Sequence, residues 1–240
     1  MKTIRLEGPG KNSLSTELME RTLRAVREAG DAPVFLTGAG DTFCAGLNLK
    51  EVIALDAEGL GKFLGVLEDL VQALYQHPGP TVAFVNGHAI AGGCVMALCC
   101  DVRVMIPRDG ARIGLNEVAL GLRFPPRTLE VCKNRVPRTS LSRVLLEAAL
   151  YTAPEAQALG LVDVVGDEAE ALSRLEKLAA HPRDAYAAAK RALQTSLAIS
   201  EAEQRRFVTE VIPKWAAPEL KERLRAVLER PATARARPLG

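Results

Sequence analysis

The sequence predicts an α/β fold with a parallel sheet, followed by a region made of helices. Short apolar strands at 33–37, 81–85 and 102–106 alternate with helical segments. Strand–helix–strand repeats of this length favour parallel pairing through crossover helices. After residue 138 the pattern becomes almost entirely helical. We therefore expect a core over residues 1–138, a helical region over 139–229 and a tail over 230–240.

The elements of the core follow from local signals. A helix is expected from about Asn12 to Glu28, with Ser13 or Ser15 as its cap. Leucines at helical spacing predict a second helix over 60–76, which Pro78-Gly79-Pro80 ends. The run at 94–100 is apolar all round, which is typical of a buried helix.

The helical region contains one brief strand, expected at 161–165. Thr152-Ala153-Pro154-Glu155 forms a capping box with proline at the first helical position. Phe207, Val211 and Trp215 share a helical face that Pro213 interrupts, and we expect this apolar face to be covered by the core or by a neighbouring subunit. Residues 230–240 are mostly Pro, Ala and Arg without a core-forming pattern, which predicts a flexible tail.

Composition excludes several classes of function. The 240 residues carry 31 basic and 29 acidic side chains, a net charge of +2, which argues against binding nucleic acid or a membrane through bulk charge. No apolar run approaches the roughly 18 residues of a membrane span. The first seven residues lack the apolar centre of a secretory signal. We expect a protein without nucleic-acid or membrane partners.

Cysteine and histidine usage bears on the compartment and on metals. The five cysteines are an odd count, three of them within one apolar stretch, which argues against a disulfide framework and for a reducing, cytoplasmic location. No C-x-x-C pair or H-E-x-x-H motif is present, and the three histidines are scattered. We therefore expect no metal site.

Two segments lead from a strand through small residues into a helix. They are Phe43-Cys44-Ala45-Gly46-Leu47-Asn48-Leu49 and Ala91-Gly92-Gly93-Cys94. Such turns leave backbone N–H groups unpaired at the start of a helix, and two donors that converge make an oxyanion hole. Either turn alone is more often a packing feature than a catalytic one.

Together with three further segments, these turns resemble the crotonase family, also called the enoyl-CoA hydratase/isomerase family. The matching segments are L-E-G-P-G-K-N-S-L-S at 6–15, F-C-A-G-L-N-L at 43–49, N-G-H-A-I-A-G-G-C at 86–94, I-G-L-N-E at 113–117 and P-E-A-Q-A-L-G-L-V-D at 154–163. The resemblance extends to about Ala192. It implies a crotonase-like ββα spiral core, a C-terminal helical trimerisation region, and homotrimers or pairs of trimers.

The resemblance also implies an acyl-CoA substrate and its contacts. The backbone N–H groups of Leu47 and Gly92 would hold the thioester oxygen. Ala45, Gly46, Leu47, Asn48 and Leu49 would line the channel of the pantetheine arm and adenine. Coenzyme A would enter as part of the substrate, with no separate cofactor. Donors already aimed at a developing enolate are worth roughly 3–4 kcal/mol of barrier each.

The reaction depends on the side chains above the acyl carbons. Hydratases of the family use two glutamates, and the first of these positions is Val95 here, while the second matches Glu117. The family's Δ3,Δ2-enoyl-CoA isomerases, enzymes of fatty acid metabolism, show this same arrangement, in which one carboxylate moves a proton from C2 to C4. Burial beside Val95 should raise the pKa of Glu117. Asn116 would hold the loop or touch the substrate.

Alternatives stay open. The first alternative is another acyl-CoA reaction of the family, such as hydration, decarboxylation or thioester hydrolysis. Arg123 lies where the acyl pocket is expected and could recognise a substrate carboxylate or face solvent. A non-enzymatic or RNA-binding homologue is another alternative, which the balanced charge disfavours. His88 and Asp101 are given structural roles. The strand that usually precedes Pro9 is expected to be short or missing.

Overall fold

The computed structural model describes residues 1–229, so the predicted tail at 230–240 lies outside the described residues. The strands of this part form two parallel sheets, one of five strands in the order β1-β2-β4-β6-β8 and one of three in the order β3-β5-β7. Their bounds are Lys2–Leu6 (β1), Val34–Gly38 (β2), Thr42–Cys44 (β3), Thr81–Val85 (β4), His88–Ile90 (β5), Val102–Met105 (β6), Ile113–Gly114 (β7) and Val164–Val165 (β8). The predicted parallel sheet is confirmed.

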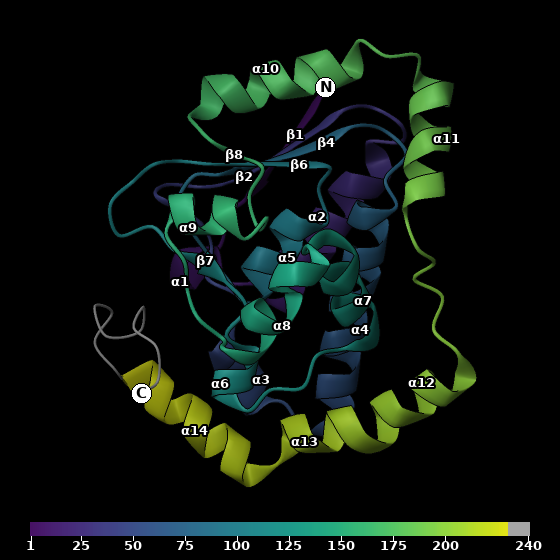
Figure 1. Ribbon diagram of the computed structural model, residues 1–240. Helices are drawn as coiled ribbons and strands as arrows, with labels where there is room; N and C mark the ends of the chain where they lie inside the picture. The colour runs from purple at the N-terminus through teal and green to yellow at the C-terminus, as the bar shows by residue number, and fades with distance from the viewer. Residues whose placement is uncertain (230–240) are drawn as a thin grey trace.

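The two sheets are built together as the chain spirals. In each of the pairs β2–β3, β4–β5 and β6–β7, the first strand joins the large sheet and the second joins the small one. Helices connect successive pairs (Figure 1). This repeated unit of two strands and a helix confirms the expected ββα spiral, and it brings the ends of β3 and β5 side by side.

The N-terminal strand corrects one expectation. Lys2–Leu6 pairs with β2 over all five of its residues, from Lys2 opposite Val34 to Leu6 opposite Gly38. Five residues is an ordinary strand length. The expectation that this strand is short or missing is therefore wrong.

The first helices confirm the predicted ones and add a short helix. They are α1 (Pro9–Asn12), α2 (Thr16–Glu28), α3 (Leu49–Ala54), α4 (Ala57–Tyr75) and α5 (Gly92–Leu98). Of the two predicted caps for α2, the structure selects Ser15, whose Oγ accepts the N–H of Leu18 at 3.2 Å. Helix α3 follows the first glycine turn, where a helix was expected, whereas the short helix α1 was not expected.

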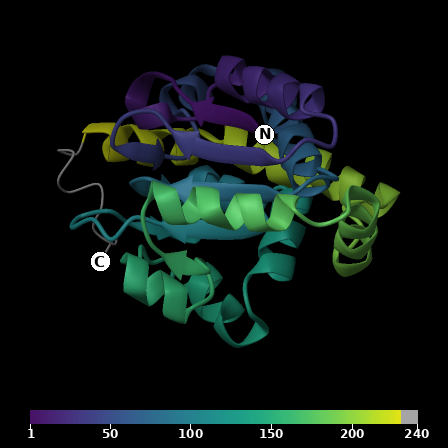
Figure 2. The same cartoon turned by 90° about the horizontal axis from the view of Figure 1, so that it is seen from above.

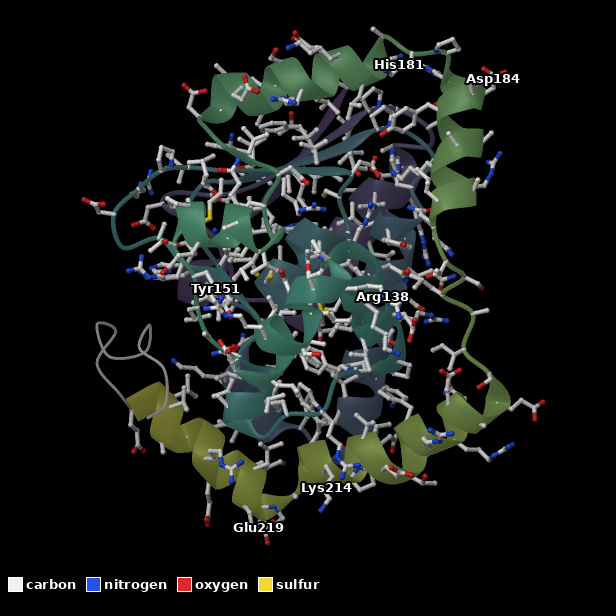
Figure 3. The ribbon with its side chains drawn as sticks, in the orientation of Figure 1. Arg138, Tyr151, His181, Asp184, Lys214 and Glu219 are labelled. Atoms are coloured by element: carbon white, nitrogen blue, oxygen red, sulfur yellow. The ribbon has the colours of Figure 1, made fainter. Side chains whose placement is uncertain are left out.

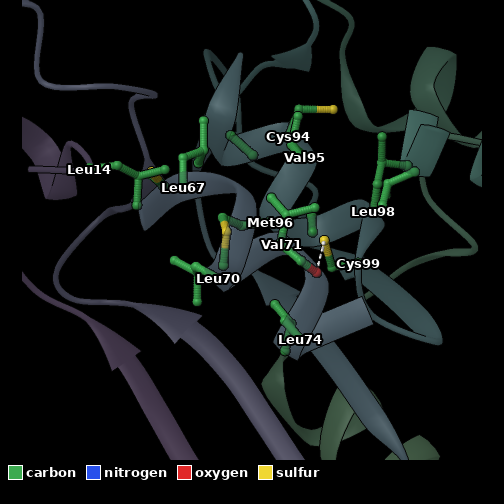
Figure 4. Close-up of a cluster of buried hydrophobic side chains, with 14 of the residues drawn as sticks. Leu14, Leu67, Leu70, Val71, Leu74, Cys94, Val95, Met96, Leu98 and Cys99 are labelled. Carbon is green, nitrogen blue, oxygen red and sulfur yellow. Dashed lines mark hydrogen bonds between the residues drawn. The ribbon is translucent and has the colours of Figure 1, made fainter. Parts of the chain in front are cut away.

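Helices α4 and α5 form the centre of the main core. Every residue of α5 is buried, as its uniform apolar character predicts. Figure 4 shows Leu70, Val71 and Leu74 beside the side chains of α5, where the Cys99 thiol donates a hydrogen bond to the Val71 carbonyl at 3.8 Å. The helix that begins at the second glycine turn is therefore held on all sides.

The later helices wrap around this core. They are α6 (Glu117–Leu120), α7 (Pro126–Arg135), α8 (Arg138–Leu146), α9 (Ala153–Ala158), α10 (Glu168–Ala179), α11 (Arg183–Leu193), α12 (Glu201–Arg206), α13 (Ile212–Ala216) and α14 (Pro218–Glu229). The predicted capping box at Thr152 and Glu155 is present. Helix α10 lies across the outer face of the large sheet and closes a small apolar cluster that includes Phe35 and Phe84 (Figure 2).

The apolar face at Phe207, Val211 and Trp215 is covered by the same chain. Phe207 and Trp215 are buried in the main core, and α13 packs on α4. A π-helical turn at Phe207–Val211 precedes Pro213, whose missing N–H cannot continue an α-helix. Lys214 and Glu219 point away from the core in Figure 3. Within residues 1–229, no helix is both long and apolar enough to cross a bilayer.

A buried charged cluster ties α11 to the core. Asp101 accepts the backbone N–H of Thr81 at 2.9 Å, which confirms the structural role expected for it. The same carboxylate accepts hydrogen bonds from Lys190 at 2.8 Å and Tyr186 at 3.0 Å. Because a buried ammonium needs such partners, α11 is fixed against the end of the large sheet.

Candidate active site

A cavity of about 620 Å³ lies where the two glycine turns, α6 and the C-terminal helices meet. Its wall contains seven of the eight predicted site residues. Glu117, Leu47, Gly92, Ala45, Asn48, Leu49 and Asn116 all border it. The eighth, Gly46, belongs to the first glycine turn but does not border the cavity. The sequence thus identified residues that the fold brings to one place from separate segments.

The two backbone groups expected to bind an oxyanion are both free. Leu14 bridges the first turn, because its N–H bonds the Gly46 carbonyl at 2.8 Å and its carbonyl accepts the Asn48 N–H at 2.9 Å. These two hydrogen bonds involve the residues on either side of Leu47 and leave the Leu47 N–H unbonded. The N–H of Gly92 lies at the start of α5, where no carbonyl precedes it in the helix. Among the described residues, neither N–H has an acceptor in the protein.

The two turns are in close contact, and glycine permits this. Gly46 has a φ of +90°, and a Cβ built on it would lie 2.8 Å from the Ile90 carbonyl oxygen and 3.7 Å from the Gly92 nitrogen. Ala91, just before Gly92, also has a positive φ of 51° with a ψ of −118°. Strained backbone of this kind persists only where the surrounding structure enforces it, and here it orients the Gly92 N–H.

Glu117 is the carboxyl group that the described residues place on the cavity wall. It is the first residue of α6 and only 7% exposed. Burial raises its pKa to about 8, an effect that its own backbone N–H opposes. Its Oε2 is buried without a hydrogen-bond partner in the described chain. Val95, fully buried, borders the same cavity and contributes no acid or base.

Asn116 places a second polar atom beside this carboxylate. Its Oδ1 is also buried and has no donor within residues 1–229. Two neighbouring residues of the cavity wall therefore each have a buried oxygen that no donor within residues 1–229 satisfies. An unmade hydrogen bond of this kind costs about 1–3 kcal/mol, so a bound molecule that donates to either atom would be stabilised.

His88, for which a structural role was predicted, lies on the cavity wall. It borders the cavity and is half-buried, and its Nδ1 has no partner among the described residues. Burial lowers its pKa, and the positive charges of Lys11 and Arg112 lower it further. The imidazole is therefore neutral at physiological pH.

Several wall residues were not predicted. Leu67 of α4, Phe124, Thr128 of α7, Trp215 of α13 and Val227 of α14 all border the cavity. Their sequence pattern marks them only as core positions. Tertiary packing alone brings them to the site, which no local signal could have revealed.

Arg123 does not reach the cavity, which settles the two readings left open for it. Its side chain is about half exposed and pairs with Glu210 at 3.5 Å. Its backbone carbonyl accepts a hydrogen bond from the indole N–H of Trp215 at 2.9 Å, and Trp215 borders the cavity. The guanidinium faces outward and offers no recognition of a substrate carboxylate.

Comparison with known proteins agrees with this geometry. A family model described as enoyl-CoA hydratase/isomerase matches residues 1–232. The mitochondrial enoyl-CoA delta isomerase 1 of Mus musculus is 33% identical over 176 residues, which cover 71% of this chain and 61% of that protein. A relative from Thermus thermophilus that carries an enoyl-CoA hydratase name is 37% identical over 177 residues, 70% of this chain and 68% of that protein.

Solved structures share the whole fold. The human mitochondrial delta3-delta2-enoyl-CoA isomerase superposes with a TM-score of 0.84 at 26% identity, covering 95% of this chain and 92% of that one. An enoyl-CoA hydratase from Bacillus halodurans gives a TM-score of 0.78 at 26% identity, covering 93% and 95%. The similarity therefore includes both an isomerase and a hydratase.

Proposed function

Because the chain belongs to the enoyl-CoA hydratase/isomerase family, we propose that it moves the double bond of an enoyl-CoA thioester from C3 to C2. The observation that supports this choice is that, among the described residues, Glu117 is the only carboxylate on the cavity wall, which it shares with the hydrocarbon side chain of Val95. A double-bond shift needs one group that removes and returns a proton. Hydration by two acids would need a second carboxylate where Val95 stands.

The first step removes a proton from C2 and places negative charge on the thioester oxygen. The N–H groups of Leu47 and Gly92 have no acceptors in the protein, so both are free to bind that oxygen. Donors fixed in advance stabilise the enolate without reorganisation, and the loss of one typically costs about 3–4 kcal/mol. The contact between the two glycine turns supports their action on a single atom.

The second step returns the proton to C4. Glu117 as carboxylate breaks the C2–H bond, and the resulting acid forms the C4–H bond, while the double bond moves from C3–C4 to C2–C3. Protons and electrons balance without an oxidant, reductant or further cofactor, and coenzyme A takes part only as a portion of the substrate. A pKa near 8 suits this exchange, because Glu117 can both take up and release a proton close to neutral pH.

The rim of the cavity supports an anionic carrier. Lys11 and Lys50 border it and are exposed. Ala45, Asn48 and Leu49 border the same cavity, and we propose that they contact the pantetheine arm. The acyl chain then takes the apolar side formed by Leu67, Phe124 and Trp215.

Hydration of a 2-enoyl-CoA is the second candidate. The Oδ1 of Asn116 and the Oε2 of Glu117 have no partner in the described residues, and both could accept hydrogen bonds from one water molecule. An enoyl chain has no donor for these two hydrogen bonds. In this alternative Asn116 would replace the missing second acid in positioning the water. Decarboxylation loses its main support because Arg123 faces outward.

Product analysis separates these candidates. Purified protein is incubated with 3-hexenoyl-CoA and, separately, with 2-hexenoyl-CoA, and the products are identified by mass and nuclear magnetic resonance. Our proposal predicts rapid formation of the conjugated isomer from the first substrate and little 3-hydroxyacyl product from the second. Fast addition of water to 2-hexenoyl-CoA with no isomerisation would select the hydratase instead.

We also propose that copies assemble as trimers or pairs of trimers in the cytoplasm. Leu146 at the end of α8 and Leu193 at the end of α11 are 71% and 86% exposed, which supports contact with another copy. All five cysteines are free and buried, which agrees with a reducing compartment. Light scattering of the purified protein measures the assembly directly.

A further inference from the structure

The segment between β1 and α2 forms a left-handed turn at the edge of the cavity. Gly10, Lys11 and Asn12 follow one another with φ values of 64°, 61° and 58°. Glycine adopts this conformation freely and asparagine tolerates it, whereas the Cβ of a lysine disfavours it. Backbone of this kind persists only where the surrounding structure holds it in place. The turn therefore needs an anchor.

Asn12 supplies this anchor from its side chain, which is only 5% exposed. Its Nδ2 donates hydrogen bonds to the carbonyl of Thr42 at 2.7 Å and to the carbonyl of Ala39 at 2.9 Å. Its Oδ1 accepts the backbone N–H of Gly8 at 3.3 Å. One buried amide group thus ties the left-handed turn to the loop that leads into β3.

The backbone on both sides of Asn12 runs along the first glycine turn. The Lys11 carbonyl accepts the N–H of Ala45 at 3.1 Å. Leu14 then bonds the residues on either side of Leu47, at 2.8 and 2.9 Å. All three hydrogen bonds come from the segment that Asn12 anchors. The direction of the Leu47 N–H therefore follows the position of this segment.

We propose that Asn12 is a positioning residue for the reaction, because its side chain fixes the segment that orients the Leu47 N–H as an oxyanion donor. Asn12 does not border the cavity, so it acts only through this backbone. The inference rests on the proposed function, since it concerns one of the two donors that would bind the thioester oxygen. Misplacement of a group in such a site by about 1 Å can cost about 10²-fold in rate.

The second donor of the pair is held from another part of the fold. The N–H of Ala91, directly before Gly92, donates to the carbonyl of Gly114 at 2.8 Å. This hydrogen bond comes from β7 and not from the segment that Asn12 anchors. Loss of the Asn12 side chain should therefore displace one oxyanion donor while Glu117 keeps its place.

Two substitutions separate the side chain of Asn12 from its backbone conformation. Asn12→Gly keeps the left-handed backbone without strain and removes the anchor. Asn12→Asp keeps the shape of the side chain but replaces its NH₂ group by an oxygen, so at most one of the two hydrogen bonds to Thr42 and Ala39 survives.

Asn86→Asp is the matched control. Asn86 is 8% exposed, and its Nδ2 donates to the carbonyls of Gly38 at 3.0 Å and Gly40 at 2.9 Å. It thus anchors the same loop between β2 and β3. Its side-chain hydrogen bonds within residues 1–229 do not reach the segment beside the first glycine turn. Asn86→Asp should therefore leave the oxyanion donors in place.

Acetoacetyl-CoA measures the oxyanion donors without turnover. Its C2 lies between two carbonyls, so it ionises readily, and its enolate absorbs in the near ultraviolet where the keto form does not. We expect the ratio of bound enolate to bound keto form, at one pH, to fall at least about tenfold in both Asn12 variants. The kcat for 3-hexenoyl-CoA should fall with this ratio.

Two further measurements distinguish positioning from general damage to the site. The affinity for free coenzyme A, which has no thioester carbonyl, should stay within about threefold of the wild type in both Asn12 variants. The midpoint of the pH profile of kcat/KM should not move, because the surroundings of Glu117 are unchanged. A structural collapse of the cavity would alter both.

The proposal is overturned if folded Asn12→Gly keeps both the enolate ratio and kcat within about twofold of the wild type. Equal losses in Asn86→Asp would also overturn it, since the effect would then come from loosening the loop. If Asn12→Gly does not fold, Asn12→Asp decides by the same criterion. A wild type that forms the enolate but does not isomerise 3-hexenoyl-CoA would contradict the proposed function and leave this test in force. Absence of the enolate in the wild type would contradict both.

Discussion

Val95 and Glu117 border the same cavity with both side chains buried, and within residues 1–229 Glu117 is the only carboxylate on the cavity wall. The arrangement keeps Glu117 largely protonated at neutral pH, because burial disfavours its charge. It also leaves one group to handle both proton transfers. The chemistry of the site therefore depends on what stands at position 95.

Replacing Val95 by glutamate should introduce the second acid that hydration requires. We expect Val95→Glu to add water to 2-hexenoyl-CoA at least about tenfold faster than the wild type, since a positioned acid or base typically contributes 10²–10⁴-fold. Val95→Gln, which has the same shape without the acid, is the matched control and should show no gain. The 3-hydroxyacyl product is measured by mass spectrometry. Equal rates in the two variants would show that position 95 does not select the reaction.

The pH dependence of the reaction follows from the pKa of Glu117, which burial raises to about 8. The carboxylate is the form that removes the C2 proton, so the active fraction of the free enzyme rises with pH until Glu117 is ionised. We expect kcat/KM for 3-hexenoyl-CoA to increase about tenfold between pH 6 and pH 7 and to level off above pH 8. A flat profile from pH 6 to pH 8 would contradict this assignment.

Stability should show the opposite trend with pH. The pKa of Glu117 is near 8 in the folded chain and near its ordinary 4.5 when unfolded. The unfolded state therefore releases a proton first, and the folded state loses stability between about pH 4.5 and pH 8. Glu117→Gln lacks this penalty. The free energy of unfolding of the variant minus that of the wild type, measured by urea denaturation, should therefore be a few kcal/mol larger at pH 9 than at pH 4.5. An equal difference at both pH values would argue against a buried, raised carboxyl.

The contact between the two turns predicts a kinetic effect of a single methyl group. In Gly46→Ala the new Cβ would lie 2.8 Å from the Ile90 carbonyl, so the turn must shift and move the Leu47 N–H. Loss of one oxyanion donor lowers kcat by about 10²–10³-fold. Gly40→Ala is the control, because Gly40 has a φ of +68° but no atom within 4 Å of a built Cβ. It should lose stability by about 1–2 kcal/mol while keeping kcat.

Local sequence signals predicted much of the fold. Strand β4 occupies the predicted residues 81–85, and Ser15 and Thr152 act as helix caps, because capping and apolar periodicity depend on neighbouring residues. The three-residue strands β3 and β5 were missed. They are too short to show alternation, and they exist because the spiral pairs them with each other.

The candidate site was predicted less evenly. Glycine turns and the segment ending in Glu117 are contiguous in sequence, so a resemblance could locate them. Trp215 and Thr128 reach the cavity from distant helices, and nothing near them in sequence marks them. Glu68 was not singled out in the sequence, and only the structure shows that its carboxyl group accepts the N–H groups of Arg127 and Thr128 at the start of α7. Arg123 was placed near the pocket by position, but its ion pair with Glu210 turns it outward.

Turnover of 3-hexenoyl-CoA by Glu117→Gln is the most direct measurement of whether one carboxylate carries the reaction. The amide keeps the shape of the side chain but cannot accept the C2 proton. We expect kcat to fall by about 10²–10⁴-fold, while the affinity for hexanoyl-CoA stays within a few-fold of the wild type because the two free amides are intact. Circular dichroism confirms that the variant is folded. Wild-type turnover in a folded Glu117→Gln protein would show that the proton is carried by another group.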